Sequence, residues 1–433
     1  MLKGLAEKIS KAETISYIGK IDNVVGLSME VQGVSANIGD VVLIQNQEEH
    51  HQIQAEVVGF KNDKVQLMAY EDVSGIGTRS FVRNTGKQLK IPVGMCLKGR
   101  VIDALGRPID DEGPLNATEY YSIGRTNTNP LTRPPIKEPL HFGVKAIDGM
   151  TTIGKGQRIG IFAGSGVGKS TLLGMIARNA KADINVIALV GERGREVREF
   201  VERDLGPEGM KRSVLVVATS DQPAMVRMRC PMVATTIAEY FKDQGNDVLL
   251  MMDSLTRFAM AQREIGLATG EPPVARGYTP SIYAEFPKLL ERSGMFNQGS
   301  ITGVYTVLVE GDDTNEPISD TVRGILDGHI VLTRKLANAN HFPAIDVNAS
   351  ISRLMTAIIP KEERELAGRV RDILSVYEKS EDLISIGAYK QGTNNKIDFA
   401  LTKIDKINEF LMQGIDDSWE REEMIAKLRE ILE

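Results

Sequence analysis

The first part of the chain has the pattern of short strands. Segments such as 54–57 and 64–67 alternate polar and apolar residues, and a turn signal at 61–63 separates them. Alternation with a period of two is typical of half-buried strands, and several short strands at close spacing favour a small barrel or sandwich. Residues 1–13 form a separate pattern, for which we expect a short amphipathic leader helix rather than a docking segment, because the stretch is so short.

The pattern changes at about residue 93, where continuous apolar runs begin to alternate with helical stretches. The apolar runs lie at 158–162, 186–190, 214–217 and 248–251. Buried strands that alternate with helices predict a parallel sheet covered on both faces. Ligands in such α/β folds bind at the carboxyl ends of the strands.

After about residue 357 the strand-like runs stop, and apolar residues recur at helical spacing. Two such series are Leu366, Val370, Ile373, Leu374 and Tyr377, and Ile397, Leu401, Ile404, Ile407 and Leu411. This end is predicted to be a small helical domain. The chain therefore divides into an N-terminal β-barrel domain with its leader helix (1–92), an α/β core (93–357) and a C-terminal helical domain (358–433).

Composition narrows the class of protein. The 433 residues are 42% hydrophobic and 25% charged, as in an ordinary globular protein, and the net charge of −6 gives no basic excess of the kind that nucleic-acid binders carry. No apolar run approaches the roughly 18 residues that span a bilayer, and the N-terminus lacks a signal-peptide pattern. With only two cysteines, a disulfide framework is not expected. We expect a cytoplasmic protein.

The clearest chemical signal follows the strand that ends at Phe162. The segment reads Ala163-Gly164-Ser165-Gly166-Val167-Gly168-Lys169-Ser170, and a helical run begins at Thr171. Strand, glycine-rich turn and helix are the context of a phosphate-binding P-loop, although Ala163 stands where the usual pattern has glycine. Backbone amides and the helix N-terminus would bind the phosphates, Lys169 would reach the β- and γ-phosphates, and Ser170 would ligate Mg²⁺. The pattern predicts a nucleotide triphosphatase that uses ATP.

A carboxylate follows another buried strand. Asp253 comes directly after Leu249-Leu250-Met251-Met252, at the end of the sheet where the loop is expected, so it can hold Mg²⁺ through water. The alternatives are a helix cap or an ion pair with Arg257. The presence of the phosphate loop favours the metal site.

Two further charged residues have less certain roles on spacing alone. Glu192 follows the strand that ends at Val190 and could orient the attacking water, whereas most charged loops are merely solvated. Arg353 could neutralise charge on the γ-phosphate of a neighbouring subunit, but from the sequence alone a structural ion pair is the favoured interpretation.

Taken together and in this order, the motifs resemble those of the catalytic subunits of the rotary ATP synthase superfamily, from about residue 15 to residue 433. GERGREV, LLMMDSLTRFAMAQRE and PAIDVNASIS are similar to the superfamily's signatures. VIDALGRPIDDEGPL, GYTPSIYAEFPKLLERSG and VLVEGDDTNEPISDTVRGILDGHIVLTRKLA are similar to the ATPases of type III protein export, and within them to the flagellar group.

The resemblance implies roles that spacing leaves open. It implies that Glu192 is the catalytic carboxylate, that Arg353 is an arginine finger and that Phe342 stacks on adenine, while Arg193 and Arg257 match positions near the active site. The implied fold is a RecA-like P-loop core with a parallel sheet, a small N-terminal β-barrel and a C-terminal helical domain.

The resemblance also implies an assembly. It implies a homohexameric ring that hydrolyses ATP with Mg²⁺ at the cytoplasmic face of the inner membrane, to which the ring is peripheral. The implied partners are export-gate, stalk and regulator proteins together with exported proteins and their chaperones. Two features depart from the rotary synthases: the loop at 389–395 is not acidic, and no second adenine-contacting aromatic is placed, with Ile415 near the expected position.

Three alternatives share parts of this pattern. The virulence ATPase of an injection apparatus has the same chemistry, and gene neighbourhood would distinguish it. The non-acidic loop at 389–395 disfavours a rotary synthase subunit. A hexameric RNA motor is disfavoured because the chain is acidic and only 5% aromatic, whereas such motors need basic grooves and stacking platforms.

Overall fold

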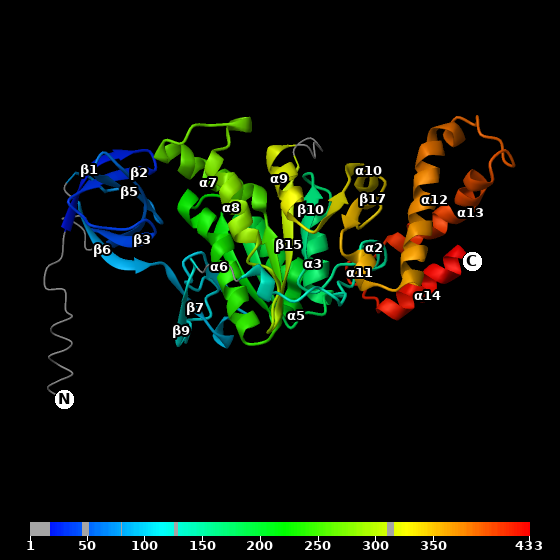
Figure 1. Cartoon of the computed structure of the whole chain (residues 1–433), viewed down its shortest axis with the longest axis horizontal. Helices are drawn as coiled ribbons and strands as arrows, with labels where there is room; N and C mark the ends of the chain where they lie inside the picture. The colour runs from blue at the N-terminus through cyan, green and yellow to red at the C-terminus, as the bar shows by residue number, and fades with distance from the viewer. Residues whose placement is uncertain (1–17, 46–51, 79, 125–128, 310–315) are drawn as a thin grey trace.

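The computed structural model describes residues 18–45, 52–78, 80–124, 129–309 and 316–433. The leader helix expected at 1–13 lies outside these residues. Three parts follow one another along the long axis of the molecule: a barrel, a core of sheet and helices, and a group of long helices that ends the chain (Figure 1). The predicted fold class is confirmed. No helix within the described ranges combines the length and the apolar character that crossing a membrane requires.

The N-terminal part is a closed antiparallel barrel with the strand order β1-β2-β5-β4-β3-β6. Its strands are β1 (Ile18–Val25), β2 (Ser28–Gln32), β3 (Asp40–Gln45), β4 (Gln52–Lys61), β5 (Lys64–Ala69) and β6 (Phe81–Gln88). Alternate side chains fill the interior; Val42, Val57 and Leu67, for example, are completely buried. The period-two pattern of the sequence thus gives one face of each strand to the core.

A buried ion pair joins the barrel to the core. Glu56 on β4 accepts hydrogen bonds from the guanidinium of Arg229, on α6 (Ala224–Asp243), and from the hydroxyl of Tyr70. Glu56 and Tyr70 are 3% and 2% exposed. Burial, together with the nearby Glu56 carboxylate, holds the pKa of Tyr70 well above its usual range, so its hydroxyl remains a donor.

We predict that Glu56→Ala lowers the free energy of unfolding by about 3–5 kcal/mol, because Arg229 would be left buried without its partner. Thermal unfolding of the wild-type and variant chains measures the difference. Asp22→Ala is the matched control in the same barrel, since it breaks the exposed pair between Lys64 and Asp22 and should hardly move the midpoint. Equal midpoints for both variants would show that the pair with Arg229 contributes nothing to the joint.

The core contains a nine-stranded sheet in the described residues, with the order β17-β16-β10-β15-β13-β11-β12-β8 and β14 paired to β15. Its strands are β8 (Val101–Asp103), β10 (Arg158–Ala163), β11 (Ile184–Glu192), β12 (Ser213–Thr219), β13 (Asp247–Asp253), β14 (Gly294–Met295), β15 (Ser300–Leu308), β16 (Gly328–Leu332) and β17 (Ile345–Ser352). All neighbouring pairs are parallel except those made by β14 and β17. A separate two-stranded sheet pairs β7 (Lys90–Val93) with β9 (Glu119–Ser122).

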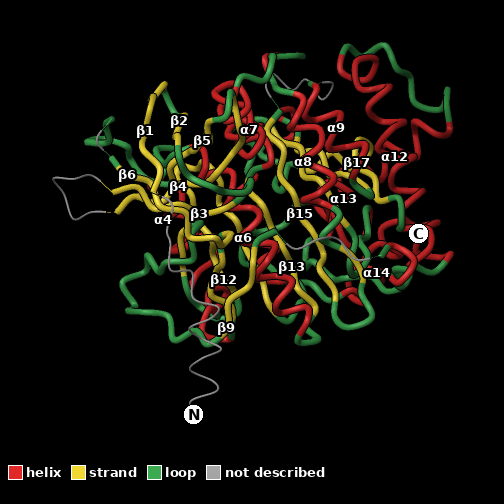
Figure 2. Tube along the Cα trace, turned by 60° about the vertical axis from the view of Figure 1, so that its left-hand side comes forward, coloured by secondary structure: helices red, strands yellow, loops and turns green. Residues whose placement is uncertain are grey.

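Helices cover both faces of this sheet, as Figure 2 shows. The core helices are α2 (Lys145–Met150), α3 (Lys169–Asn179), α4 (Gly194–Glu199), α5 (Gly206–Met210), α6, α7 (Leu255–Thr269), α8 (Pro280–Leu290), α9 (Pro317–Ile325), α10 (Arg334–Asn338) and α11 (Met355–Ile358). Along β11, Val186 and Ala188 join the cluster under α6, α7 and α8, whereas Ile187 and Leu189 join the cluster under α2 and α3. A strand buried on both faces explains the continuous apolar run in the sequence.

The chain ends in α12 (Lys361–Ser385), α13 (Asn395–Leu411) and α14 (Arg421–Leu432), which pack on the core through the cluster that also contains α2 and α3. Gln413, 6% exposed, ties this helical domain to the core. Its side chain accepts from the amide of Lys145 at 2.9 Å and donates to the carbonyl of Gly143 at 2.8 Å, and its own amide donates to the carbonyl of Phe342 at 2.9 Å.

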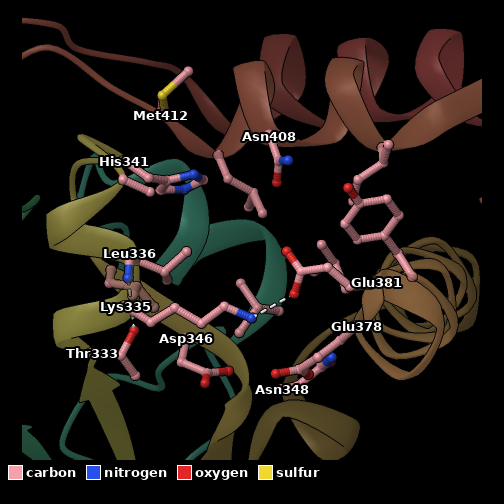
Figure 3. A pocket seen from close by; sticks show the side chains of 17 residues that line it. Thr333, Lys335, Leu336, His341, Asp346, Asn348, Glu378, Glu381, Asn408 and Met412 are labelled. Atoms are coloured by element: carbon pink, nitrogen blue, oxygen red, sulfur yellow. Dashed lines mark hydrogen bonds and ion pairs between the residues drawn. The ribbon is translucent and has the colours of Figure 1, made fainter. Parts of the chain in front are cut away.

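A cavity of about 460 Å³ lies at the same junction, between β17 and α10 on the core side and α12 and α13 on the other (Figure 3). An ion pair between Lys335 and Glu381, 2.8 Å long, bridges the two sides. The helical domain is therefore held to the core by the shared apolar cluster, and the cavity and this ion pair lie beside that packed interface.

Candidate functional site

The glycine-rich loop, Glu192 and Asp253 come together at the carboxyl ends of three parallel strands. β10 leads into the glycine-rich loop, β11 ends at Glu192, and β13 ends at Asp253. β15 separates β10 from β13 in the sheet, and β13 is paired with β11. Because parallel strands end at the same edge of a sheet, three segments distant in sequence are brought to one place, where α/β folds bind their ligands.

The glycine-rich loop has the backbone that phosphate binding requires. Gly166 and Gly168 have φ angles of 79° and 87°, in the left-handed region that favours glycine, and Gly168 caps the N-terminus of α3. Ser165 and Ser170 are exposed beside them, whereas Gly164 and Val167 are buried and hold the loop to the core. Thr171, in the first turn of α3, is half-buried. The amides of this turn and the positive end of α3 make a site for an anion.

Lys169 lies between the two carboxylates. Its ammonium is hydrogen-bonded to Asp253 Oδ1 and lies 3.8 Å from Glu192 Oε1. All three side chains are largely buried, at 12%, 5% and 14% exposure for Lys169, Asp253 and Glu192. A lysine that is shared by two carboxylates at the mouth of a phosphate loop is well placed to bind phosphate oxygens.

Neither alternative considered for Asp253 is found. In the described part of the chain its ion-pair partner is Lys169, not Arg257. The cap of α7 is Ser254, whose hydroxyl accepts from the amide of Arg257 at 3.3 Å. Asp253 also accepts a 2.7 Å hydrogen bond from Thr306 on β15. Sequence reasoning missed Thr306, because β15 reads SITGVYTVL and already contains Ser300 and Thr302, so one more hydroxyl gave no distinct signal.

The environment of Glu192 favours its neutral form. The pKa of this carboxyl group is raised to about 7, mainly by burial and then by the charge of Asp253, while the ammonium of Lys169 acts in the opposite direction. Glu196, in the first turn of α4, raises it through a hydrogen bond and through its charge. A carboxylate that titrates near neutral pH is suited to accept a proton or to polarise water.

Phe342 lies against the loop from the other side. A Cβ atom on Gly168 would be 3.5 Å from the Phe342 ring, and the ring is 40% exposed. A flat, partly exposed apolar surface is thus available next to the loop. Ile415 is 51% exposed, and its carbonyl accepts from Arg178 Nη2 at 2.6 Å.

Two of the predicted arginines, Arg193 and Arg257, have different surroundings. Arg193 is 78% exposed and pairs with Glu196 at 3.4 Å. Arg257 packs its aliphatic part near Gly191, and its buried Nε has no hydrogen-bond partner among the described residues. An unsatisfied buried donor next to Gly191, the residue before Glu192, is what an anionic ligand would satisfy.

Arg353 is not brought to the site. β17 runs antiparallel to β16, with Ser352 opposite Gly328, so Arg353 lies at the opposite edge of the sheet from the loop. Its amide donates to the carbonyl of Asp327 at 3.0 Å, beside Arg158, the first residue of β10. The six residues of β10 span roughly 17 Å, and the glycine-rich loop follows the last of them. Arg353 therefore cannot serve the site of its own chain.

The residues present fit a magnesium ion that is bound together with phosphates. The hydroxyl of Ser170 is exposed at the loop, and Asp253 offers a carboxylate. Mg²⁺ prefers a small number of protein oxygens and completes its shell with water and phosphate.

Comparisons with known proteins agree with this arrangement. Family models match residues 21–86 (ATP synthase alpha/beta family, beta-barrel domain), 143–352 (ATP synthase alpha/beta family, nucleotide-binding domain) and 359–430 (T3SS EscN ATPase C-terminal domain). The flagellum-specific ATP synthase of Bacillus subtilis is 53% identical over 427 residues, 98% of each chain.

Two solved structures are also similar. One is the assembled ATPase EscN from the enteropathogenic E. coli type III secretion system, with a TM-score of 0.91 and 47% identity over 96% of this chain and 100% of that one. The other shows EscN in complex with its central stalk EscO, with a TM-score of 0.89 and 46% identity over the same shares.

Proposed function

The chain belongs to the ATP synthase alpha/beta family, among the ATPases of type III protein export, and on this premise we propose that it hydrolyses ATP in a homohexameric ring to energise the export of flagellar proteins. The flagellar assignment is supported by the flagellum-specific relative from Bacillus subtilis, which is 53% identical, against 49% for the type 3 secretion system ATPase of Xanthomonas euvesicatoria. The observation that carries the chemistry is Lys169 held between Asp253 and Glu192 at the mouth of the loop.

Each residue in this site has a task that follows from its position. The amides from Gly164 to Ser170, with Lys169, bind the β- and γ-phosphates, and the base lies against Phe342. Ser170 and Asp253 would hold Mg²⁺, which neutralises charge on the phosphate oxygens when it is bound. Glu192 orients the attacking water and polarises it.

Arg353 completes the site of a neighbouring copy in this proposal. It is exposed at the far edge of the sheet, so identical subunits arranged in a ring can each supply an arginine to the next. The related EscN structure is of an assembled ATPase, which supports a ring. Specific activity should therefore rise steeply with protein concentration as rings form. Constant specific activity from monomer to ring would contradict the proposal.

A stalk partner is proposed at the tip of the hairpin between α12 and α13. Asp398 organises this tip, since it accepts from the hydroxyl of Tyr389 at 2.8 Å and from the amide of Gly392 at 2.9 Å. Ile386 beside it is 76% exposed. EscN is known in complex with a central stalk, and a structured tip with an exposed apolar residue suits such a contact. The export gate, the regulator, the exported proteins with their chaperones, and peripheral attachment to the inner membrane are proposed from the family alone.

The pH dependence of hydrolysis should report Glu192. Its carboxyl group is protonated below about pH 7 and cannot then polarise water, so kcat/KM for Mg-ATP should rise with pH through about 7 and level off above it. Because Glu196 raises this pKa, Glu196→Gln should move the rise to lower pH. A profile that is flat down to about pH 5 would contradict the assignment.

The choice between flagellar and virulence export is tested in the source bacterium. Deleting the gene should abolish flagellar filaments, and the wild-type gene should restore them while Lys169→Ala should not. Intact filaments together with a loss of effector secretion would instead assign the chain to an injection apparatus. The similarity to EscN is the observation that favours this alternative. Stimulation of hydrolysis by RNA would point to an RNA motor.

A further inference from the structure

Thr306 is a polar residue in the apolar middle of the sheet. It lies on β15, which is hydrogen-bonded to β10 on one side and to β13 on the other, with Thr306 opposite Ile161 of β10. Its side chain is completely buried, as are those of Tyr305 and Val307 on either side. A hydroxyl in such a place costs free energy unless it is hydrogen-bonded, so its partner is informative.

That partner is the carboxylate of Asp253. Thr306 Oγ1 donates to Asp253 Oδ1 at 2.7 Å and lies 3.2 Å from the carbonyl of Met252. Lys169 donates to the same oxygen, Oδ1. Among the described residues no hydrogen bond to the other oxygen, Oδ2, is found. The two donors thus fix the carboxylate through one oxygen and leave the other to accept from outside the protein.

The two donors differ in what they can do next. Lys169 is on the first turn of α3, on a long side chain that can turn towards phosphates, as the proposed function requires. Thr306 is short and belongs to a strand that is paired on both sides, so it stays where it is. Once the lysine binds phosphate, Thr306 is the remaining donor to Asp253 Oδ1 among the described residues.

We propose that Thr306 is a positioning residue, which holds Asp253 in the orientation that receives hydrated Mg²⁺. The inference rests on the proposed function, because it assigns a task within the same site. A carboxylate held by a fixed neighbour loses less conformational freedom when its ligand arrives, and residues of this kind typically change metal affinity by 10- to 100-fold when they are mutated.

The test is the dependence of nucleotide binding on metal. ADP binding by the full chain is measured by calorimetry with excess Mg²⁺ and again with EDTA, for wild type, Thr306→Val and Thr306→Ser. Valine keeps the shape and removes the hydroxyl, so the gain in ADP affinity from Mg²⁺ should fall by roughly tenfold or more, while affinity in EDTA is unchanged. Serine retains the donor and should restore most of the gain.

Thr235→Val is the matched control. Thr235 is also completely buried, but its hydroxyl donates only to the carbonyl of Pro231 in the same helix, at 2.8 Å. It should leave the metal-dependent gain at the wild-type level. If Thr306→Val does not fold, Thr306→Cys keeps the volume with a much weaker donor and should show the same loss.

The possible outcomes distinguish a failure of the role of Thr306 from a failure of the proposed nucleotide site. A folded Thr306→Val or Thr306→Cys chain that keeps the full gain from Mg²⁺ overturns the role of Thr306 alone. Equal losses in Mg²⁺ and in EDTA would also overturn it, since they indicate a general structural effect. A wild-type chain that binds ADP no better with Mg²⁺ than with EDTA would refute the proposed site itself.

Discussion

Replacing Arg353 with alanine should reduce the maximal rate of ATP hydrolysis by roughly 10³-fold or more, with little change in nucleotide affinity. Arginines supplied to the γ-phosphate in the transition state contribute about 10³–10⁵ to the rate where they have been measured. Arg353 is exposed and its only side-chain hydrogen bond among the described residues is a 3.4 Å contact with the carbonyl of Arg323, so its removal should not unfold the chain. Steady-state kinetics and equilibrium binding of ADP measure the two effects.

Mixing experiments make this prediction specific to a neighbouring subunit. Lys169→Ala chains lack a working phosphate site but carry Arg353, and Arg353→Ala chains have the reverse defect. Mixed rings should therefore recover activity that neither variant has alone. Arg429→Ala, which removes one positive charge from the exposed surface of α14, should leave hydrolysis unchanged. Mixed rings that form and remain inactive would show that Arg353 does not act across the interface.

Glu192→Gln should lower kcat by roughly 10²- to 10⁴-fold, because an amide keeps the shape of the side chain but cannot act as a base. Nucleotide binding should persist, since the loop and Lys169 are untouched and one negative charge near the phosphates is removed. Stability should not fall, because burial already disfavours the charged form of Glu192. Single-turnover kinetics with ring formation monitored in parallel would separate chemistry from assembly.

The control for this substitution is Glu196, in the first turn of α4. Glu196 is within the same charged stretch, and Glu196→Gln removes a neighbouring carboxylate, which raises the pKa of Glu192, while Glu192 itself stays in place. Hydrolysis at a pH well above neutral should then stay near the wild-type rate. Full activity of Glu192→Gln would remove this residue from the mechanism.

The sequence predicted the fold class because its signals are local. Alternation in the barrel, continuous apolar runs in the sheet and helical spacing after residue 357 each depend on neighbours in the chain. Long-range pairing is not visible in this way. Spacing alone could not tell that Glu192 and Asp253 share Lys169, since that depends on β10, β11 and β13 ending at one edge.

The surroundings of two residues, Thr306 and Arg353, could not be predicted from the sequence. Thr306 is one of several residues of β15 that carry a hydroxyl, and only the register between β13 and β15 places its hydroxyl on Asp253. For Arg353, the interpretation favoured by the sequence alone was a structural ion pair, and the side chain in fact forms no ion pair among the described residues. What distinguishes it is the reversed direction of β17, a property of the whole sheet.

The reversed direction of β17 has a consequence for when the protein would consume ATP. Because β17 carries Arg353 away from the phosphate loop of its own chain, a single copy lacks, in the proposed mechanism, the arginine that its site needs for hydrolysis. In that mechanism, newly made copies that have not yet assembled would consume little ATP. The proposed mechanism would therefore confine ATP consumption to the place where the ring assembles.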